Sequence, residues 1–145
     1  MAIIPYLERG DVVCTDRFRE SMVYGSEKNN AIDLHMLVEL NLRLHGQYWV
    51  WPDRVFVFDL PAELAIERGK VSGRQFDEME KIDTLSRVRD NFQMFAKEYP
   101  EANLCFVDAS RNIEEVFFDV RAELVKCATQ KKFKLDPEAL RLVSA

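Results

Sequence analysis

Three short, unbroken apolar runs, each ending at or beside an aspartate, constrain the fold of this 145-residue chain more than any other feature. They are Val12–Asp16, Val55–Leu60 and Leu104–Asp108. Their apolar residues are continuous instead of alternating, which is typical of strands that helices cover on both faces of a parallel sheet. The sequence therefore predicts three buried strands of such a sheet.

Amphipathic helices are predicted between and after these strands. Apolar residues recur at helical spacing on two predicted faces, made of Ile32, Met36, Leu37, Leu40 and Leu44 and of Ile113, Val116, Phe117, Val120 and Leu124. Asn112 and Glu115 form a predicted capping box for the second of these helices. A third helix is predicted over Glu78–Glu98, and a last one from Asp136-Pro137 through Leu142.

The alternation of strands and helices predicts an α/β fold with parallel strands and right-handed crossovers, and the length suits one domain. A net charge of −5 argues against a protein that coats nucleic acid. No apolar stretch reaches the roughly 18 residues of a membrane span. Three widely separated cysteines favour a reducing compartment, with Cys14 and Cys105 as small buried residues. We therefore expect a cytoplasmic protein without a nucleic-acid or membrane partner.

The chemistry is expected where the strands end, because ligands of open parallel sheets bind outside the carboxyl ends of the strands. Asp16, Asp59 and Asp108 would gather along that edge, with Arg17 directly after the first of them. An Asp-Arg pair there can orient a magnesium shell through its carboxylate and hold a phosphate through its planar guanidinium. A purely structural ion pair is the alternative interpretation, since both residue types are common in turns and caps.

Three segments, in order, resemble the thymidylate kinase family. They read IIPYLERGDVVCTDRFRESMVYG, PDRVFVFDLPAELAIER and MEKIDTLSRVRDNFQMFAKEYPEANLCFVDASRNIEEV, within about residues 3–125. The resemblance implies a P-loop nucleoside-monophosphate-kinase-like parallel sheet with flanking helices. It also implies an enzyme that uses ATP and Mg2+ to phosphorylate dTMP, giving dTDP.

On the acceptor side, the resemblance implies that Asp16 places the magnesium ion and the reacting phosphates. Arg17 would hold the phosphate of the acceptor nucleotide, with Ser21 and Tyr24 near that nucleotide. Gly25 departs from the family pattern, because many relatives carry a glutamine there whose amide can read the thymine ring. The preference for a particular base therefore stays open.

On the donor side, Arg68 matches an arginine that lies against the adenine of ATP, and Ala109, Ser110 and Arg111 match the turn on its other side. Residues from about 69 to 77 match the family's mobile lid, from which Lys70 or Arg74 would reach the transferring phosphoryl group. A solvated basic loop is the alternative interpretation of that lid stretch.

The phosphate-binding motif G-x-x-x-x-G-K-[ST] occurs nowhere in the 145 residues. We therefore expect residues 1–145 to form a single partial domain, incomplete at the N-terminus, that begins with the family's third strand. Three functions stay open: the C-terminal part of a kinase, a noncatalytic relative that binds nucleotides or serves in assembly, and a kinase completed by a separate chain. A homodimer is compatible with each of them.

Overall fold

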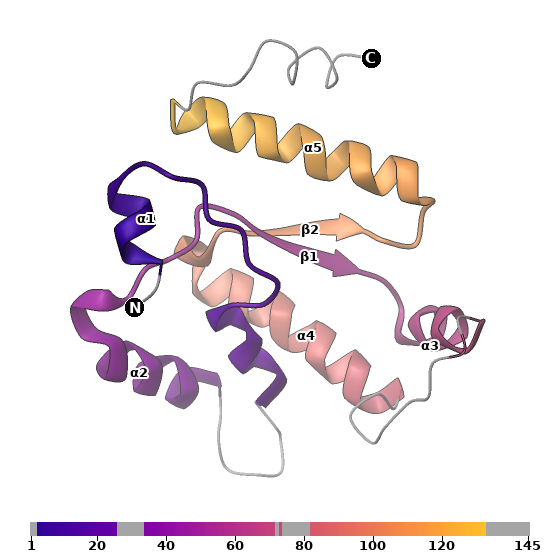
Figure 1. The fold of residues 1–145 in the computed structure, drawn as a ribbon. Helices are drawn as coiled ribbons and strands as arrows, with labels where there is room; N and C mark the ends of the chain where they lie inside the picture. The colour runs from indigo at the N-terminus through magenta and orange to yellow at the C-terminus, as the bar shows by residue number, and fades with distance from the viewer. Residues whose placement is uncertain (1–2, 26–33, 72, 74–81, 133–145) are drawn as a thin grey trace.

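The computed structural model describes residues 3–25, 34–71, 73 and 82–132. Within these residues, helices alternate with two strands and three short 3-10 helices (Figure 1). In order, the elements are α1 (Ile4–Glu8), η1 (Arg19–Gly25), α2 (Leu34–His45), η2 (Gly46–Tyr48), β1 (Val55–Asp59), α3 (Ala62–Val71), α4 (Ile82–Glu98), η4 (Pro100–Ala102), β2 (Leu104–Asp108) and α5 (Ile113–Gln130).

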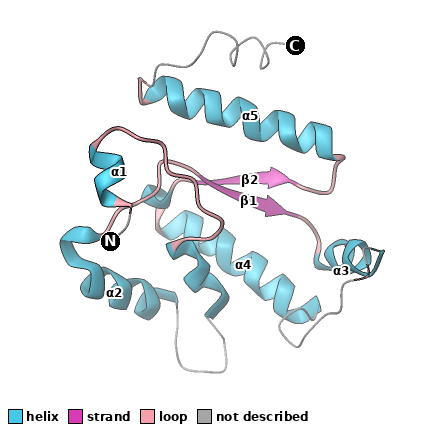
Figure 2. Ribbon diagram, viewed as in Figure 1, coloured by secondary structure: helices cyan, strands magenta, loops and turns pink. Residues whose placement is uncertain are grey.

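The two strands pair in parallel, in register from Val55 opposite Leu104 to Asp59 opposite Asp108. The chain between them passes through α3 and α4, as parallel pairing requires. Helix α4 covers one face of this small sheet and α5 lies over the other, as Figures 1 and 2 show. The predicted α/β class is confirmed, and so are both of these strands, the first one residue shorter than predicted.

The prediction of a strand at Val12–Asp16 is wrong. This run has no secondary structure before the bend at Asp16, and its side chains are largely exposed, Val12 by 71%. A strand needs a ladder partner for its backbone groups, and among the described residues β1 and β2 pair only with each other. Cys14 is consequently exposed and not buried as predicted, whereas Cys105 on β2 is partly buried.

The core lies on the α4 face of the sheet, where α4 meets α2 and η1. Phe95 and Val23 are fully buried there, and Trp51 and Tyr99 pack around Phe95 with ring centroids 6.4 and 5.1 Å away. The buried members of this cluster are Val23, Leu34, Val38, Val88, Phe92, Phe95 and Ala102. Burial of such side chains supplies most of the stabilisation of a small domain.

Helix α2 buries a different face from the predicted one. Leu34 and Val38 are 1% exposed, while Met36, Leu40 and Leu44 of the predicted face are at least half exposed. The helix is apolar on more than one side, and the side that packs is the one that meets η1 and α4. Periodicity alone cannot choose between two apolar faces of one helix.

Helix α5 begins with the predicted capping box. The Glu115 amide donates to Asn112 Oδ1 at 2.9 Å, and the Asn112 amide donates to Glu115 Oε2 at 3.3 Å. The predicted covered face is wrong in part, because Ile113 and Phe117 are 77% and 61% exposed. Helix α4 starts at Ile82, and residues 78–81 and the predicted last helix lie outside the described residues.

None of the described helices is long and apolar enough to cross a membrane.

Candidate functional site

The carboxyl ends of β1 and β2 bring Asp59 and Asp108 together as register partners. The amide of Ala109 donates to the Asp59 carbonyl at 2.8 Å, which continues the pairing one residue past the strands. This confirms that two of the three strand-end aspartates share one edge of the sheet. Asp16, the third, is exposed at a bend outside any strand.

A tight turn follows Asp108 and leads into α5. The amide and the hydroxyl of Ser110 both donate to Asp108 Oδ1, at 2.9 and 2.5 Å. These hydrogen bonds, the hydroxyl's first, hold the pKa of Asp108 below its usual value. Arg111 forms an ion pair with Asp119 in the second turn of α5, and this pair raises the pKa of the Arg111 guanidinium. The turn is therefore fixed from both of its ends.

Arg68, in the last turn of α3, reaches across to this turn. Its Nη1 donates to the Ala109 carbonyl at 2.6 Å, and its Nη2 donates to the Ser110 carbonyl at 2.6 Å and the Arg111 carbonyl at 3.5 Å. The structure thus assembles the four residues that the sequence suggested for adenine binding. Their role in binding stays a prediction. A guanidinium held flat in this way is a suitable surface for an aromatic ring.

Arg17 and Tyr24 form a second contact among the predicted residues. The Arg17 guanidinium carbon lies 5.0 Å from the centroid of the Tyr24 ring. Arg17 also has a φ of +68°, which is uncommon for a residue other than glycine, and its carbonyl accepts a hydrogen bond from the Thr15 hydroxyl at 3.0 Å. Ser21 lies in η1 and is partly buried. The structure therefore places Arg17, Ser21 and Tyr24 within eight residues of one compact segment, next to α4.

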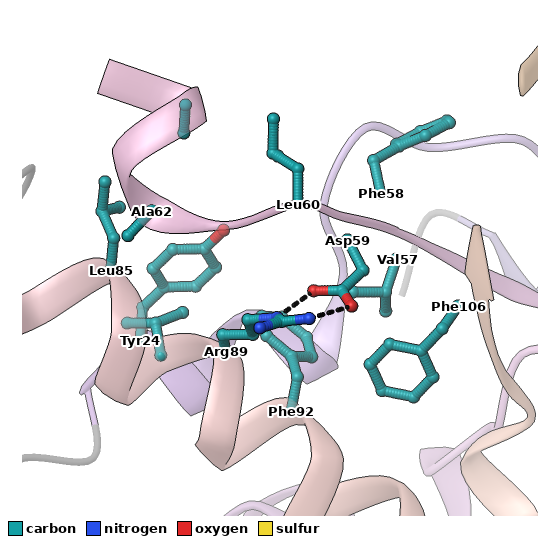
Figure 3. Close-up of a pocket in the computed structure, with 12 residues that line it drawn as sticks. Tyr24, Val57, Phe58, Asp59, Leu60, Ala62, Leu85, Arg89, Phe92 and Phe106 are labelled. Atoms are coloured by element: carbon teal, nitrogen blue, oxygen red, sulfur yellow. Dashed lines mark hydrogen bonds and ion pairs between the residues drawn. The ribbon is translucent and has the colours of Figure 1, made fainter. Parts of the chain in front are cut away.

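A hollow of about 160 Å³ opens beside Tyr24 at the carboxyl end of β1 (Figure 3). Its wall is mostly apolar and aromatic. The ring of Phe92 meets the Tyr24 ring edge to face, with centroids 5.7 Å apart. The lining residues are Tyr24, Val57, Phe58, Asp59, Leu60, Ala62, Ala65, Leu85, Val88, Arg89, Phe92 and Phe106.

This wall contains a charged pair of which only one member was predicted: Asp59 is one of the three strand-end aspartates, whereas its partner Arg89 was not among the predicted residues. Arg89 Nε and Nη2 donate to the two carboxylate oxygens of Asp59 at 2.5 and 2.9 Å, a bidentate arrangement that Figure 3 shows. The hydrogen bonds and charge of Asp59 raise the pKa of Arg89. Asp59 is therefore occupied by an arginine and is not an open metal ligand. The sequence did offer a signal for this pair, because a carboxylate at the end of a strand is followed by a helix that carries arginines.

The remaining predicted residues are not gathered into this arrangement. Lys70 is exposed in the last turn of α3, and Arg74 lies outside the described residues together with most of the predicted lid. In the described part of the chain there is no cluster of three or more metal-ligating side chains. Mg2+ in nucleotide sites commonly uses one or two carboxylates plus substrate phosphates, so the exposed carboxylate of Asp16 fits that demand.

Comparison with known proteins gives a consistent answer. The thymidylate kinase family model matches residues 1–120. The chain is 36% identical over 127 residues to a thymidylate kinase of Nitratidesulfovibrio vulgaris, covering 81% of this chain and 57% of that protein. It is also 36% identical over 121 residues to a probable thymidylate kinase of Thermococcus gammatolerans, covering 81% of this chain and 53% of that protein.

The chain spans about half the length of the curated relatives it matches. The family's fold is the P-loop nucleoside monophosphate kinase fold, which agrees with the parallel strands and flanking helices described above. Three ordered motifs, the family match and the identity to several curated relatives all point the same way. The chain belongs to the thymidylate kinase family.

Proposed function

We propose that this chain carries the nucleotide-binding edge of a kinase that transfers the γ-phosphoryl group of ATP to dTMP, giving dTDP. The observation that carries the proposal is the bridge from Arg68 to the carbonyls of residues 109–111. This bridge lies at the carboxyl edge of the parallel strands, where ligands of such sheets bind. Membership in the thymidylate kinase family supports the choice of reaction.

On the acceptor side, Arg17 holds the phosphate of dTMP. A guanidinium presents two parallel N–H groups to a phosphate, and such charge-assisted hydrogen bonds are among the strongest in proteins. Its contact with the Tyr24 ring limits the directions in which the guanidinium can point. Tyr24 and Ser21 line the path toward the nucleoside.

On the donor side, the adenine of ATP lies against Arg68, with Ser110 and Arg111 at its edge. The hydrogen bonds from Arg68 to backbone carbonyls keep its plane fixed before the nucleotide arrives. Asp16 would hold Mg2+, which neutralises charge on the phosphate oxygens when bound. Lys70 and Arg74 would add positive charge near the transferring group.

Phosphoryl transfer also needs a cradle of backbone N–H groups around the ATP phosphates, and the 145 residues contain no G-x-x-x-x-G-K-[ST] motif. The proposed reaction therefore requires a cradle from outside these residues, either from the same gene or from another chain. A second candidate function is a noncatalytic relative that only binds nucleotides, which would hold if no such cradle accompanies these residues.

Binding measurements on the 145-residue chain test the acceptor assignment. Arg17→Ala should raise the Kd for dTMP about tenfold or more, because hydrogen bonds to charged groups contribute about 1.5–3 kcal/mol. Arg121→Ala is the matched control and should leave the Kd within about twofold, since Arg121 belongs to α5 and this helix lies on the opposite face of the sheet from η1. Equal Kd values for both variants would remove Arg17 from the site.

Catalysis is tested separately by following dTDP formation from ATP and dTMP. The chain alone should be at least about 10²-fold slower than a full-length relative, because loss of even one preorganised donor costs about that much. An in-frame phosphate-loop motif in the DNA upstream of Met1 would support the kinase, and an upstream stop codon would favour the noncatalytic relative or the two-chain kinase.

A further inference from the structure

A single stretch of α4 contacts both the end of β1 and the segment that carries the acceptor residues. Arg89 binds Asp59 with two hydrogen bonds. Two residues on, Asn91 Nδ2 donates to the carbonyl of Val23 in η1 at 3.4 Å. The next residue, Phe92, meets Tyr24 edge to face. Within four residues, α4 therefore joins the sheet to η1.

Tyr24 is held by contacts on two sides. The Phe92 ring lies at an interplanar angle of 82° to it, and the guanidinium of Arg17 lies over it at 5.0 Å. Arg17 itself is exposed. The orientation of Arg17 therefore depends on where Tyr24 sits, and Tyr24 sits where α4 places Phe92.

The Asp59–Arg89 pair is suited to fix α4 at this point. The side chain of Asp59 is 20% exposed and that of Arg89 is 42% exposed, so the pair is partly shielded from water. The bidentate geometry also sets the direction of the arginine and not only its distance. The Arg43–Glu39 pair on α2 differs in both respects, because its side chains are 76% and 63% exposed and join neighbouring turns of one helix.

We propose that Arg89 is a positioning residue for the acceptor phosphate, acting through Phe92 and Tyr24 on Arg17. By locking α4 to the end of β1, Arg89 sets the place of the Phe92 ring and thus the orientation of the guanidinium that meets the phosphate. This inference rests on the proposed function for the identity of the ligand. The coupling between Arg89 and Tyr24 is a property of the chain itself.

The coupling is tested without any nucleotide by fluorine NMR. The chain has four tyrosines, so 3-fluorotyrosine labelling gives a small spectrum in which Tyr24→Phe identifies the Tyr24 signal. Arg89→Met should shift or broaden that signal, whereas Arg43→Met should leave it in place. Asp59→Asn, which keeps the shape of the side chain and removes its charge, should act like Arg89→Met and serves if that variant does not fold. A Tyr24 signal that Asp59→Asn leaves unchanged would overturn the inference.

Binding of dTMP then tests the consequence for the site. Arg89→Met should raise the Kd about tenfold, since a displacement of 1 Å in a positioned group can cost up to about 10²-fold. Arg89→Lys should recover part of the loss. In a chain that already carries Arg17→Ala, Arg89→Met should cause no further loss.

Independent, multiplicative losses in the double variant would overturn the inference, because Arg89 would then act on binding by another route. If the unmodified chain does not bind dTMP, the proposed acceptor fails, and the NMR result alone decides whether Arg89 positions Tyr24. The two failures are therefore distinguishable.

Discussion

Helices α4 and α5 have 17 and 18 residues and lie on opposite faces of the same two strands, yet they are buried very differently. Helix α4 contributes Val88, Phe92 and Phe95 to the core, whereas no residue of α5, all of which is described, is buried. Helix α4 also packs against η1, α3 and η4, while α5 meets mainly β2. An amphipathic pattern thus indicates that a helix has apolar surface to cover, and the rest of the molecule decides which side is covered and how completely.

The largest expected effect that tests this contrast between α4 and α5 is on the free energy of unfolding. Phe95→Ala removes a ring that is 0% exposed and should lower the free energy of unfolding by about 3–5 kcal/mol. Phe117→Ala on α5 removes a ring that is 61% exposed and should change it by no more than about 0.5 kcal/mol. Urea unfolding followed by circular dichroism measures both. A comparable loss from Phe117→Ala would break the comparison, because α5 would then have a buried face in solution.

A smaller effect is expected from the start of α5, which its capping box stabilises in place of core contacts. Asn112→Ala should lower the free energy of unfolding by about 1 kcal/mol, because the Glu115 amide loses its acceptor. Gln130→Ala, at the exposed far end of the same helix, is the matched control and should have almost no effect. If the two variants are equally stable, the capping box does not contribute to the stability of the fold.

The smallest expected effect concerns the turn that joins β2 to α5. Ser110→Ala should raise the pKa of Asp108 part of the way to its usual value, because the hydroxyl contact is lost and the amide contact is kept. In the unmodified chain the lowered pKa means that this carboxylate stabilises the fold above the unfolded-state pKa of about 4. That contribution is lost as the pH falls through the folded-state pKa. An NMR pH titration of the Asp108 carboxyl group measures the shift, and an unchanged pKa in Ser110→Ala would show that the hydroxyl is not its cause.

Features encoded by adjacent residues were predicted well from the sequence. Strand β2 was predicted to the residue and β1 to within one, because each is a short apolar run with a clear end. The capping box of α5 depends on residues three apart and was also found. Val12–Asp16 has the same local pattern as the two strands, but a strand also needs a neighbour, and the described chain offers it none.

The candidate site shows the same difference between features encoded by adjacent residues and features that depend on distant partners. The Asp16-Arg17 pair and the turn at Ala109–Arg111 could be proposed from the sequence because each is a short contiguous stretch, and their roles in binding stay predictions. Arg89 could not be identified in this way, since its partner Asp59 is 30 positions away and an arginine on a helix usually faces solvent. Long-range pairs of this kind become visible only when the packing of α4 against β1 is known.

The Arg68 bridge has a consequence for how this chain tolerates change over evolutionary time. Its three acceptors are all main-chain oxygens, so replacing the side chains at positions 109–111 leaves every acceptor in place as long as the turn keeps its shape. Position 68 has no such freedom, because a lysine has a single ammonium group and cannot reproduce the planar fork. Selection on the bridge itself should therefore fall on position 68, whereas selection on the side chains of Ser110 and Arg111 should act through the shape of the turn that they fix.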